Sequence, residues 1–471
     1  MTAFNPPSLS TSNRNPRLLL IVAVAVAVRV AMIAAFKFQL DNDPDMYAGL
    51  AIHVAQGHGY LRPDTVGQTA YRPPIYPLLL ATVIEAKHSV WWIAWIHLLL
   101  GTGSVVLTWF AAERLLSGTA RDIRDDEGFD GERPPRTVNA PFVAAGWVAV
   151  DPLLLQNTVL VMTETLATLL AVLVLWMTAD DSRKHAAAVA IGVIFGLCCL
   201  CRPTFWAFGG LVGVVWFARQ FLTRPNTVPL DSRLSTLDPQ PTLDPRSSIL
   251  HPRRLALCAV LGTAVTVAPW AIRNWMVFGR PIITTTHGGY TLLLVHNPVY
   301  YREVVEQAWG TAWPSESLTA WQASLETALR ADGVPPFDEV ARDRWMYRQA
   351  WRNIADDPGL AVRAGWTLLG RFWGVMPLNT PERSLPTALR WGIGLFYVAE
   401  FLAMGLGLWR LTRAEWPRWW PLVALIVSFT CVHYLYWADM RMRAPLVPAI
   451  ALLAARGLTS KSQGPSKEAR T

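Results

Sequence analysis

Three aspartates at alternate positions, Asp41, Asp43 and Asp45, follow the first long apolar run of the chain, in the stretch DNDPDMYAGLAIHVAQGHGY. A carboxylate held beside a hydroxyl nucleophile can act as its general base. Acids also favour the N-terminus of a helix, so capping of the following helix is the alternative interpretation of Asp43 and Asp45. The choice depends on which other charged groups share their face of the molecule.

Further ionisable residues stand at the ends of apolar segments, where burial in hydrocarbon is costly. They are Glu164 in VMTETL, Arg202 in CLCRPTF, Arg273 in WAIRN, and Arg441 and Arg443 in YWADMRMRAPL. A structural ion pair explains any single one of them. Together they indicate a site for an anionic group, because a planar guanidinium donates two hydrogen bonds to phosphate and keeps its charge in a low dielectric. With a base nearby, such a site suits transfer of a group from a lipid phosphate to an alcohol.

The composition places these residues in a membrane protein. The chain has 471 residues, is 52% hydrophobic and only 16% charged, and contains 23 tryptophans, which is more apolar than a soluble domain. The run Leu18–Phe38 predicts an uncleaved first membrane span, because no small-residue cleavage site follows it. With the later apolar runs it predicts an all-α polytopic membrane protein of about ten transmembrane helices. The later runs are Val90–Leu116, Ala140–Leu155, Val159–Ala179, Ala186–Cys201, Thr204–Leu222, Leu255–Val277, Ala388–Leu411, Pro421–Trp437 and Ala444–Leu458.

Positive charge marks the segments predicted to lie in the cytoplasm. With the N-terminus inside, every inside segment is basic, which satisfies the positive-inside rule and places both termini in the cytoplasm. The net charge of +8 therefore mostly reflects the orientation of the chain in the membrane. For this reason the charge does not predict a nucleic-acid partner. The predicted organisation is a cytoplasmic tail 1–17, a transmembrane catalytic core 18–277 with a first outer loop 39–89 and a cytoplasmic linker 223–254, an outer helical segment 278–387, C-terminal transmembrane helices 388–458 and a cytoplasmic tail 459–471.

The two outer segments are longer than connectors need to be. In the first, Met46, Leu50 and Val54 recur every four residues, which predicts a short amphipathic helix in the membrane interface. The stretch YRPPIYPLLLATVIEA, Tyr71–Ala86, predicts a second, half-embedded helix. In the second outer segment, the apolar positions of Asp338–Pro358 fit helical spacing. Amphipathic helices are therefore expected on the outer face.

These segments also carry a family resemblance. NDPDMYAGLAIHVAQGHGY followed by YRPPIYPLLLA resembles the first outer loop of the C-type (GT-C) glycosyltransferases, which include protein O-mannosyltransferases and aminoarabinose transferases. Further matches in the family's order are VMTETL, GLCCLCRPT, PWAIRNWMVFGRPIITTTHGGYTLLLVHNP and RMRAPLVPAIALLAARGL. The resemblance implies an enzyme that moves a sugar, with inversion, from a polyprenyl-phosphate carrier to a hydroxyl of a lipid, glycan or protein at the outer membrane face. It also implies an integral protein of a bacterial inner or plasma membrane, in contact with membrane lipids.

Roles follow from the resemblance residue by residue. Asp43, four residues before Tyr47, matches the catalytic base, with Asp41 and Asp45 as alternatives or as groups that orient the sugar. The motif Arg441-Met442-Arg443 stands where the pattern has Arg-Tyr, so which arginine meets the donor phosphate stays open. The candidate substrate-binding residues are Tyr47, Tyr60, Arg72, Glu164, Arg202, Arg273, Asn274, Arg441 and Arg443.

Cofactors and competing functions follow from the same residues. No cofactor is predicted, and a divalent metal held by the aspartates and Glu164 is the weaker alternative because no fixed ligand spacing is present. The five cysteines lie in apolar stretches and have neither zinc nor disulfide spacing. A transporter or lipid flippase would carry charges at mid-span, whereas these charges lie at outer ends. A non-catalytic paralogue, in which the acids only cap helices, is the other alternative.

Overall fold

The computed structural model describes residues 16–63, 67–87, 89–127, 140–179, 185–222, 245–378 and 385–459. Within these ranges the chain is helical, and the only extended pairing is an isolated bridge between Leu61 and Gln68. The predicted all-α class is therefore confirmed. Most of the predicted tails 1–17 and 459–471 and of the linker 223–254 lies outside the described residues.

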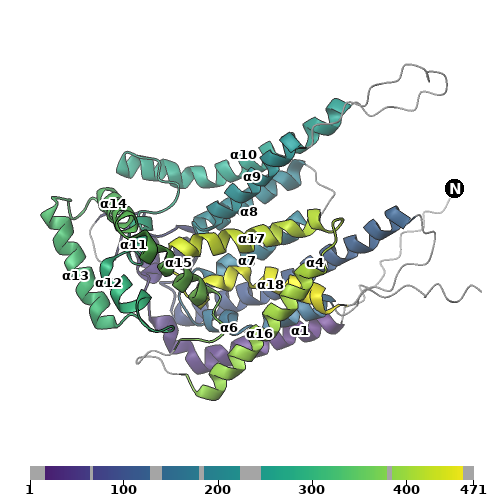
Figure 1. The fold of residues 1–471 in the computed structure, drawn as a ribbon, viewed down its shortest axis with the longest axis horizontal. Helices are drawn as coiled ribbons and strands as arrows, with labels where there is room; N and C mark the ends of the chain where they lie inside the picture. The colour runs from purple at the N-terminus through teal and green to yellow at the C-terminus, as the bar shows by residue number, and fades with distance from the viewer. Residues whose placement is uncertain are drawn as a thin grey trace, which may run out of the picture.

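Apolar helices form an elongated bundle (Figure 1). Among the described residues, five helical segments are long and apolar enough to cross a membrane. They are α1 (Pro16–Phe36) with its 3₁₀ extension η1 (Lys37–Asp41), α4 (Ser89–Glu127), α10 (Pro245–Phe278), α16 (Thr387–Trp409) and α17 (Trp416–Leu435). Shorter helices fill the bundle: α5 (Ala140–Val150), α6 (Pro152–Asn157), α7 (Glu164–Thr178), α8 (His185–Cys201), α9 (Phe205–Leu222) and, after the 3₁₀ helix η3 (Met440–Leu446), α18 (Val447–Leu458). The chain is a helical membrane protein.

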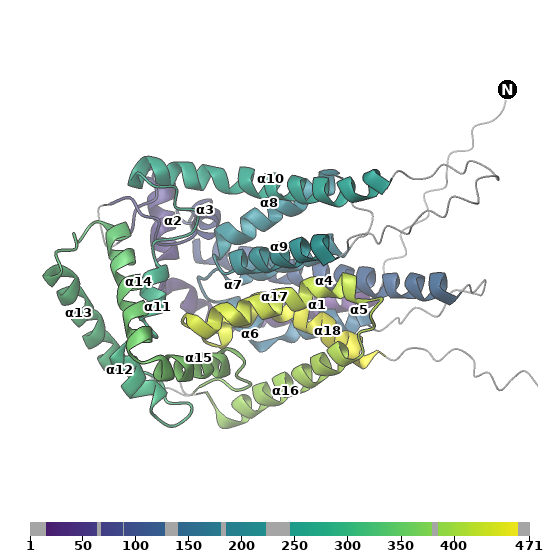
Figure 2. The same cartoon turned by 45° about the horizontal axis from the view of Figure 1, so that its top comes forward.

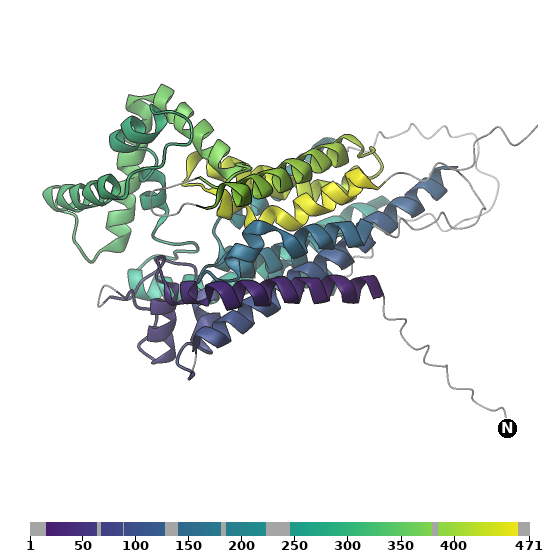
Figure 3. The ribbon, with the colours of Figure 1, turned by 90° about the horizontal axis from the view of Figure 1, so that it is seen from below.

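The remaining elements gather at one end of the bundle (Figure 2). They are α2 (Tyr47–Ala55), α3 (Ile75–Ala81), α11 (Gly288–Leu293), α12 (Pro298–Tyr300), the π-helical turn η2 (Tyr301–Val305), α13 (Ser315–Ala331), α14 (Glu339–Asp356) and α15 (Pro358–Phe372). Figure 3 shows the purple α1 running along the bundle toward the end where the green outer helices lie. The two segments that the sequence predicts to be outer therefore meet at one end.

The apolar run Ala140–Leu155 is not the single helix that the sequence predicts. It breaks at Asp151, whose backbone is extended and whose carboxylate Oδ1 accepts a hydrogen bond from Leu154 N at 2.9 Å. Pro152 occupies the first turn of α6, a position that proline tolerates because its missing N–H would have no helical partner. The Asp-Pro pair therefore starts a new helix inside an apolar run. Similarly, the expected span from Val159 becomes helical only at Glu164.

Glycines allow the bundle helices to approach closely. A Cβ atom on Gly407 of α16 would lie 1.9 Å from the carbonyl oxygen of Leu453 in α18, and one on Gly457 would lie 2.2 Å from that of Ala403. Small residues are the usual means of packing membrane helices, because burial from lipid gives little hydrophobic gain. As a result α18 is buried along nearly its whole length in the centre of the bundle.

Carboxylates of α14 tie the outer helices to the first outer loop. Glu339 accepts hydrogen bonds from Thr69 Oγ1 at 2.7 Å and from Ala70 N at 2.6 Å. Asp343, one turn later, accepts a hydrogen bond from Gly289 N of α11 at 2.7 Å. Side chains spaced four apart share one helix face, so α14 holds the loop and α11 together.

Candidate active site

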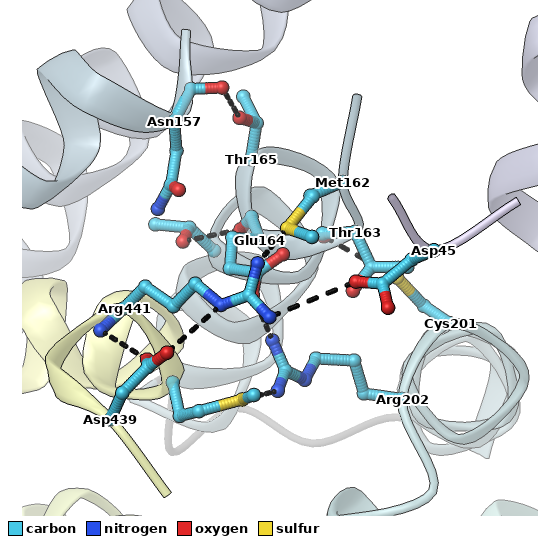
Figure 4. A network of polar contacts seen from close by, with 12 residues as sticks. Asp45, Asn157, Met162, Thr163, Glu164, Thr165, Cys201, Arg202, Asp439 and Arg441 are labelled. Atoms are coloured by element: carbon cyan, nitrogen blue, oxygen red, sulfur yellow. Dashed lines mark hydrogen bonds and ion pairs between the residues drawn. The ribbon is translucent and has the colours of Figure 1, made fainter. Parts of the chain in front are cut away.

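The predicted charged residues meet where several helices end. Asp45 precedes α2, Glu164 is the first residue of α7, Arg202 follows α8 and Arg441 belongs to η3. Figure 4 shows Arg441 extending between Asp439 and Asp45, with Arg202 beside Glu164. These segments are distant in sequence, so only the fold brings the side chains together.

Asp45 forms ion pairs with two arginines. Its Oδ1 lies 2.6 Å from Arg72 Nη2, and its Oδ2 lies 3.7 Å from Arg441 Nη2. Arg72 Nε also donates to the Asp45 carbonyl oxygen at 3.0 Å. Met46 directly after it has φ of 63°, the only left-handed non-glycine residue among the described ranges, and it turns the chain into α2. Asp45 is therefore a salt-bridge partner and not a helix cap.

Glu164 lies between the guanidinium groups of Arg202 and Arg441. Its buried Oε1 is 3.1 Å from Arg202 Nη1 and 4.0 Å from Arg441 Nε. Both nitrogens are buried and, within the described residues, lack a hydrogen-bond acceptor of good geometry. Buried N–H groups without acceptors are rare in folded proteins. These nitrogens form ion pairs with Glu164 and Asp439 but no hydrogen bond of good geometry, so each can still donate one to a further anion.

The remaining contacts of these arginines include sulfur atoms. Arg202 Nη2 donates to the thioether of Met442 at 2.8 Å, and Arg441 Nη1 donates to that of Met162. A thioether is a weak acceptor, whereas a phosphate oxygen is a strong one. An entering phosphate would consequently gain more from these donors than the sulfur atoms do.

Asp43 both caps α2 and retains an unused oxygen. Its Oδ2 accepts a hydrogen bond from Gly49 N at 2.8 Å, so capping, one of the two predicted interpretations, is present. Its Oδ1 is buried and has no hydrogen-bond partner among the described residues. Burial raises the pKa of Asp43, as does the charge of Asp45 to a smaller extent, while backbone N–H groups at the start of α2 oppose the rise. This oxygen has the free lone pairs that a general base requires.

Two tyrosines predicted as substrate-binding residues support Arg72 instead of lining open space. The buried ring of Tyr47 packs edge-on against Tyr76 at 5.3 Å, and the Arg72 guanidinium lies 5.4 Å from its centre. Burial raises the pKa of Tyr47 above that of a free phenol, so its hydroxyl stays protonated. The Tyr60 hydroxyl lies 3.1 Å from the carbonyl oxygen of Arg72 and can donate to it. Both rings therefore fix the segment that presents Arg72 to Asp45.

Other predicted residues lie apart from this cluster. Asp41 is exposed and forms no ion pair within the described part of the chain. Arg273 Nη1 donates to Thr69 O at 2.7 Å, and Asn274 Nδ2 donates to Ile282 O at 2.7 Å, so these two side chains hold loops. Arg443 has no exposed surface and bonds carbonyl groups at the end of α15. The residues brought together are Asp45, Arg72, Glu164, Arg202 and Arg441, with Asp43 beside Asp45.

Asp439 is a member of the cluster that sequence reasoning does not single out. Its Oδ2 lies 3.3 Å from Arg441 Nε, and its Oδ1 accepts a hydrogen bond from Arg441 N at 2.9 Å. The signal was its place two residues before Arg441 in YWADMRMR. In the ranges that the structure covers, no three histidine, cysteine or acidic side chains converge as metal ligands.

The fold has counterparts among solved structures. No family model and no curated protein sequence matches the chain. The oligosaccharyltransferase of Archaeoglobus fulgidus, solved with a tethered acceptor peptide that contains an NVT sequon, matches with a TM-score of 0.50 and 13% identity over 94% of this chain and 49% of its own. This chain has a C-type glycosyltransferase fold. The resemblance that the motifs predict is thus confirmed at the level of the fold.

Two further structures match less closely. The A. fulgidus enzyme AglB with an inhibitory peptide and a dolichol-phosphate has a TM-score of 0.47 and 12% identity, over 93% of this chain and 50% of its own. ArnT from Cupriavidus metallidurans, bound to undecaprenyl phosphate, has a TM-score of 0.39 and 16% identity, over 95% of this chain and 78% of its own. The chain spans about half the length of the archaeal enzymes.

Proposed function

We propose that the chain is an integral membrane glycosyltransferase that moves a hexosyl or pentosyl group from a polyprenyl-phosphate carrier to a hydroxyl acceptor, with inversion. The acceptor belongs to a lipid, a glycan or a protein. The reaction takes place at the outer face of a bacterial inner or plasma membrane, which the chain crosses about ten times with both termini in the cytoplasm.

One observation carries the proposal. Two arginines have buried N–H groups that form ion pairs but, among the described residues, no hydrogen bond of good geometry. Asp43, which lies near their partner Asp45, has a carboxylate oxygen without a hydrogen-bond partner in the same part of the chain. Arg202 Nη1 and Arg441 Nε supply the donors, and Asp43 Oδ1 supplies the acceptor. An ion-pair cluster that served only to stabilise the fold would be expected to satisfy these atoms. Their pattern fits a reaction that needs an anion site and a base together.

The charges suit the bond changes of the reaction. The acceptor oxygen would attack the anomeric carbon while its proton moves to Asp43 Oδ1. The bond from that carbon to the phosphate oxygen would break, and its electron pair would stay with the polyprenyl phosphate. Arg441 and Arg202, already in place, would stabilise the growing negative charge without reorganisation. This mechanism assigns no cofactor, so transfer is expected to survive treatment of the membranes with a chelator.

The test measures transfer by membranes that contain the chain. Vesicles are incubated with undecaprenyl phosphate carrying tritiated mannose, glucose or arabinose in separate arms, and acceptor-dependent loss of label from the carrier is followed. We expect turnover with at least one donor and a loss of about 10²-fold to 10⁴-fold in Asp43→Asn, the usual contribution of a positioned base. Asp356→Asn, which alters an exposed aspartate at the end of α14, is the matched control and is expected to keep full activity.

The outcomes separate the competing functions. Near-normal turnover by Asp43→Asn would show that Asp43 is not the general base. If Asp41→Asn or Asp45→Asn then lost activity by the same factor, that residue would be the base instead. Uptake of the intact donor without cleavage would indicate a transporter or flippase. Absence of both transfer and uptake with every donor would favour a non-catalytic paralogue.

A further inference from the structure

A second set of buried charges lies inside the helix bundle, apart from the proposed site. Its members are Arg443 of η3, Asp151 at the break between α5 and α6, and Glu400 of α16. All three side chains have 0% exposed surface. Ionisable groups inside a membrane bundle are costly to bury, so their presence marks a requirement of structure or function.

Arg443 connects three separate elements. Its Nη1 donates to the carbonyl oxygens of Phe372 at 2.8 Å and Gly374 at 3.1 Å, at the end of α15. Its guanidinium carbon lies 4.6 Å from the centre of the Tyr397 ring, a cation–π contact with α16. The Tyr397 hydroxyl in turn donates to Asp151 Oδ2 at 3.3 Å. Arg443 therefore fixes η3 against α15, α16 and the α5–α6 break.

With Arg29 of α1, the cluster holds two cations and two acids. Both carboxylate oxygens of Glu400, and Nε and Nη2 of Arg443, lack hydrogen-bond partners among the described residues. Arg443 attracts both acids, Asp151 more strongly than Glu400. Arg29 is also attracted by Asp151, and it donates to the carbonyl oxygens of Val148 and Ala149 just before the break. Removal of Arg443 together with Glu400 would consequently leave a neutral Arg29–Asp151 pair.

Arg441 and Arg443 point to different surroundings because they lie two residues apart in a 3₁₀ helix. Such a helix has about three residues per turn, so positions i and i+2 project in different directions. Arg441 reaches Asp45 and Asp439 at the proposed site, whereas Arg443 enters the packed bundle. A donor phosphate would have to enter this packed interior to contact Arg443.

We infer that Arg443 is a positioning residue, which holds η3 so that Arg441 can contact the donor phosphate, and that it does not bind the phosphate itself. The phosphate part of the inference rests on the proposed function. The charge coupling of Arg443 to Glu400 stands on the buried cluster alone. Of the two arginines in the RMR motif, Arg441 is therefore the one that contacts the donor phosphate.

The test compares Arg443→Met, Glu400→Met, the double variant and Arg441→Met in the full purified chain. Melting temperature in detergent and binding of undecaprenyl phosphate, measured by native mass spectrometry, are the two readouts. Each single change at 443 or 400 is expected to lower the melting temperature, because it leaves the buried cluster with unequal numbers of positive and negative charges. The double variant is expected to recover more than half of the Arg443→Met loss and to bind the probe within about threefold of wild type, since a coupled pair is not additive.

Arg441→Met is expected to show the opposite pattern, a near-normal melting temperature with probe binding weakened about tenfold or more. Arg371→Met is the matched control for loss of a guanidinium that donates to a carbonyl, here Thr311 O at 2.7 Å. Combined with Glu400→Met, it is expected to give additive losses and no recovery. If Arg443→Met yields no folded protein, the double variant still supplies both readouts.

Two outcomes would overturn the inference. A double variant as unstable as Arg443→Met would show that the two charges are not coupled. A double variant that regains stability but binds undecaprenyl phosphate about tenfold more weakly than wild type would place Arg443 at the phosphate. If the wild-type chain itself fails to bind the probe, the proposed function fails, while the melting temperatures still decide the coupling.

Discussion

At the scale of single residues, the two oxygens of the Asp43 carboxylate have different surroundings. Oδ2 accepts a hydrogen bond from Gly49 N, which orients the group, whereas Oδ1 is buried and no described residue forms a hydrogen bond with it. The same residue therefore serves as a helix cap and as a candidate base. Capping and catalysis are compatible here because each uses one oxygen.

The raised pKa of Asp43 predicts the pH dependence of transfer. Burial is the main cause, and the neighbouring Asp45 charge adds to it. A base must be deprotonated, so kcat/KM is expected to fall on acidification at a higher pH than an ordinary aspartate would give. Asp45→Asn removes the like charge, which lowers the Asp43 pKa, and the acid limb of kcat/KM should shift to lower pH. The measured quantity is the pH at the midpoint of the acid limb of kcat/KM. This pH does not depend on how much the maximal rate of the variant falls.

The control for this shift is again Asp356→Asn, whose profile should coincide with that of the wild type because the residue is exposed on α14. An unchanged midpoint in Asp45→Asn would mean that the acid limb reports a group other than Asp43.

At the scale of elements, the contact between α11 and α14 depends on a glycine. A Cβ atom on Gly289 would lie 2.2 Å from the backbone oxygen of Asp343, which cannot move away as a flexible side chain could. Gly289→Ala is expected to force the two helices apart and to lower stability by about 1–3 kcal/mol, the usual cost of overpacking. Melting temperature and the rate of chymotrypsin cleavage in the outer helices measure this effect.

Gly210→Ala in α9 is the matched substitution, because in the described part of the chain no atom outside its own stretch of helix lies within 4 Å of its Cβ position. It should leave the melting temperature unchanged or slightly higher, since alanine favours a helix over glycine by up to about 1 kcal/mol. Equal behaviour of the two variants would contradict the close approach of α11 to α14.

The helices were largely predictable from apolar runs, but their ends and breaks were not. Hydropathy averages over many residues, so Asp151-Pro152 is hidden inside an apolar run although it starts a new helix. Hydropathy also does not tell which helices are buried inside the bundle, because a helix that faces lipid and one that faces protein are both apolar. The burial of nearly all of α18 depends on its close glycine contacts with α16, which hydropathy does not report.

At the scale of the whole molecule, the sequence motifs identified most of the charged residues that meet at the proposed site. Asp45, Glu164, Arg202 and Arg441 all lie at or next to helix ends, and the sequence marks them as charged residues at the edges of apolar runs. The separation of Arg441 from Arg443 was not predictable, because it depends on side-chain direction within a short 3₁₀ helix. The same holds for Arg273, whose partner carbonyls in the first outer loop are set by the tertiary fold.

The proposed reaction also fixes how the whole molecule is oriented in the membrane. The outer helices and the candidate site lie at one end of the bundle, and the connection between α16 and α17 lies at the other. We expect the first end to face outward because the segments predicted to be inside are basic. Single cysteines test this expectation when placed at Ala323 of α13 and at Ala414 between α16 and α17, both of which are exposed alanines.

The background for this measurement lacks the native thiols, of which Cys431 is exposed and Cys258 is half-buried. In intact spheroplasts, a membrane-impermeant maleimide should label Ala323→Cys at once. It should label Ala414→Cys only after permeabilisation, because the bilayer then no longer separates the reagent from that end. The reversed pattern would place the candidate site in the cytoplasm. In that case a donor presented at the outer face could not reach Asp43 or Arg441.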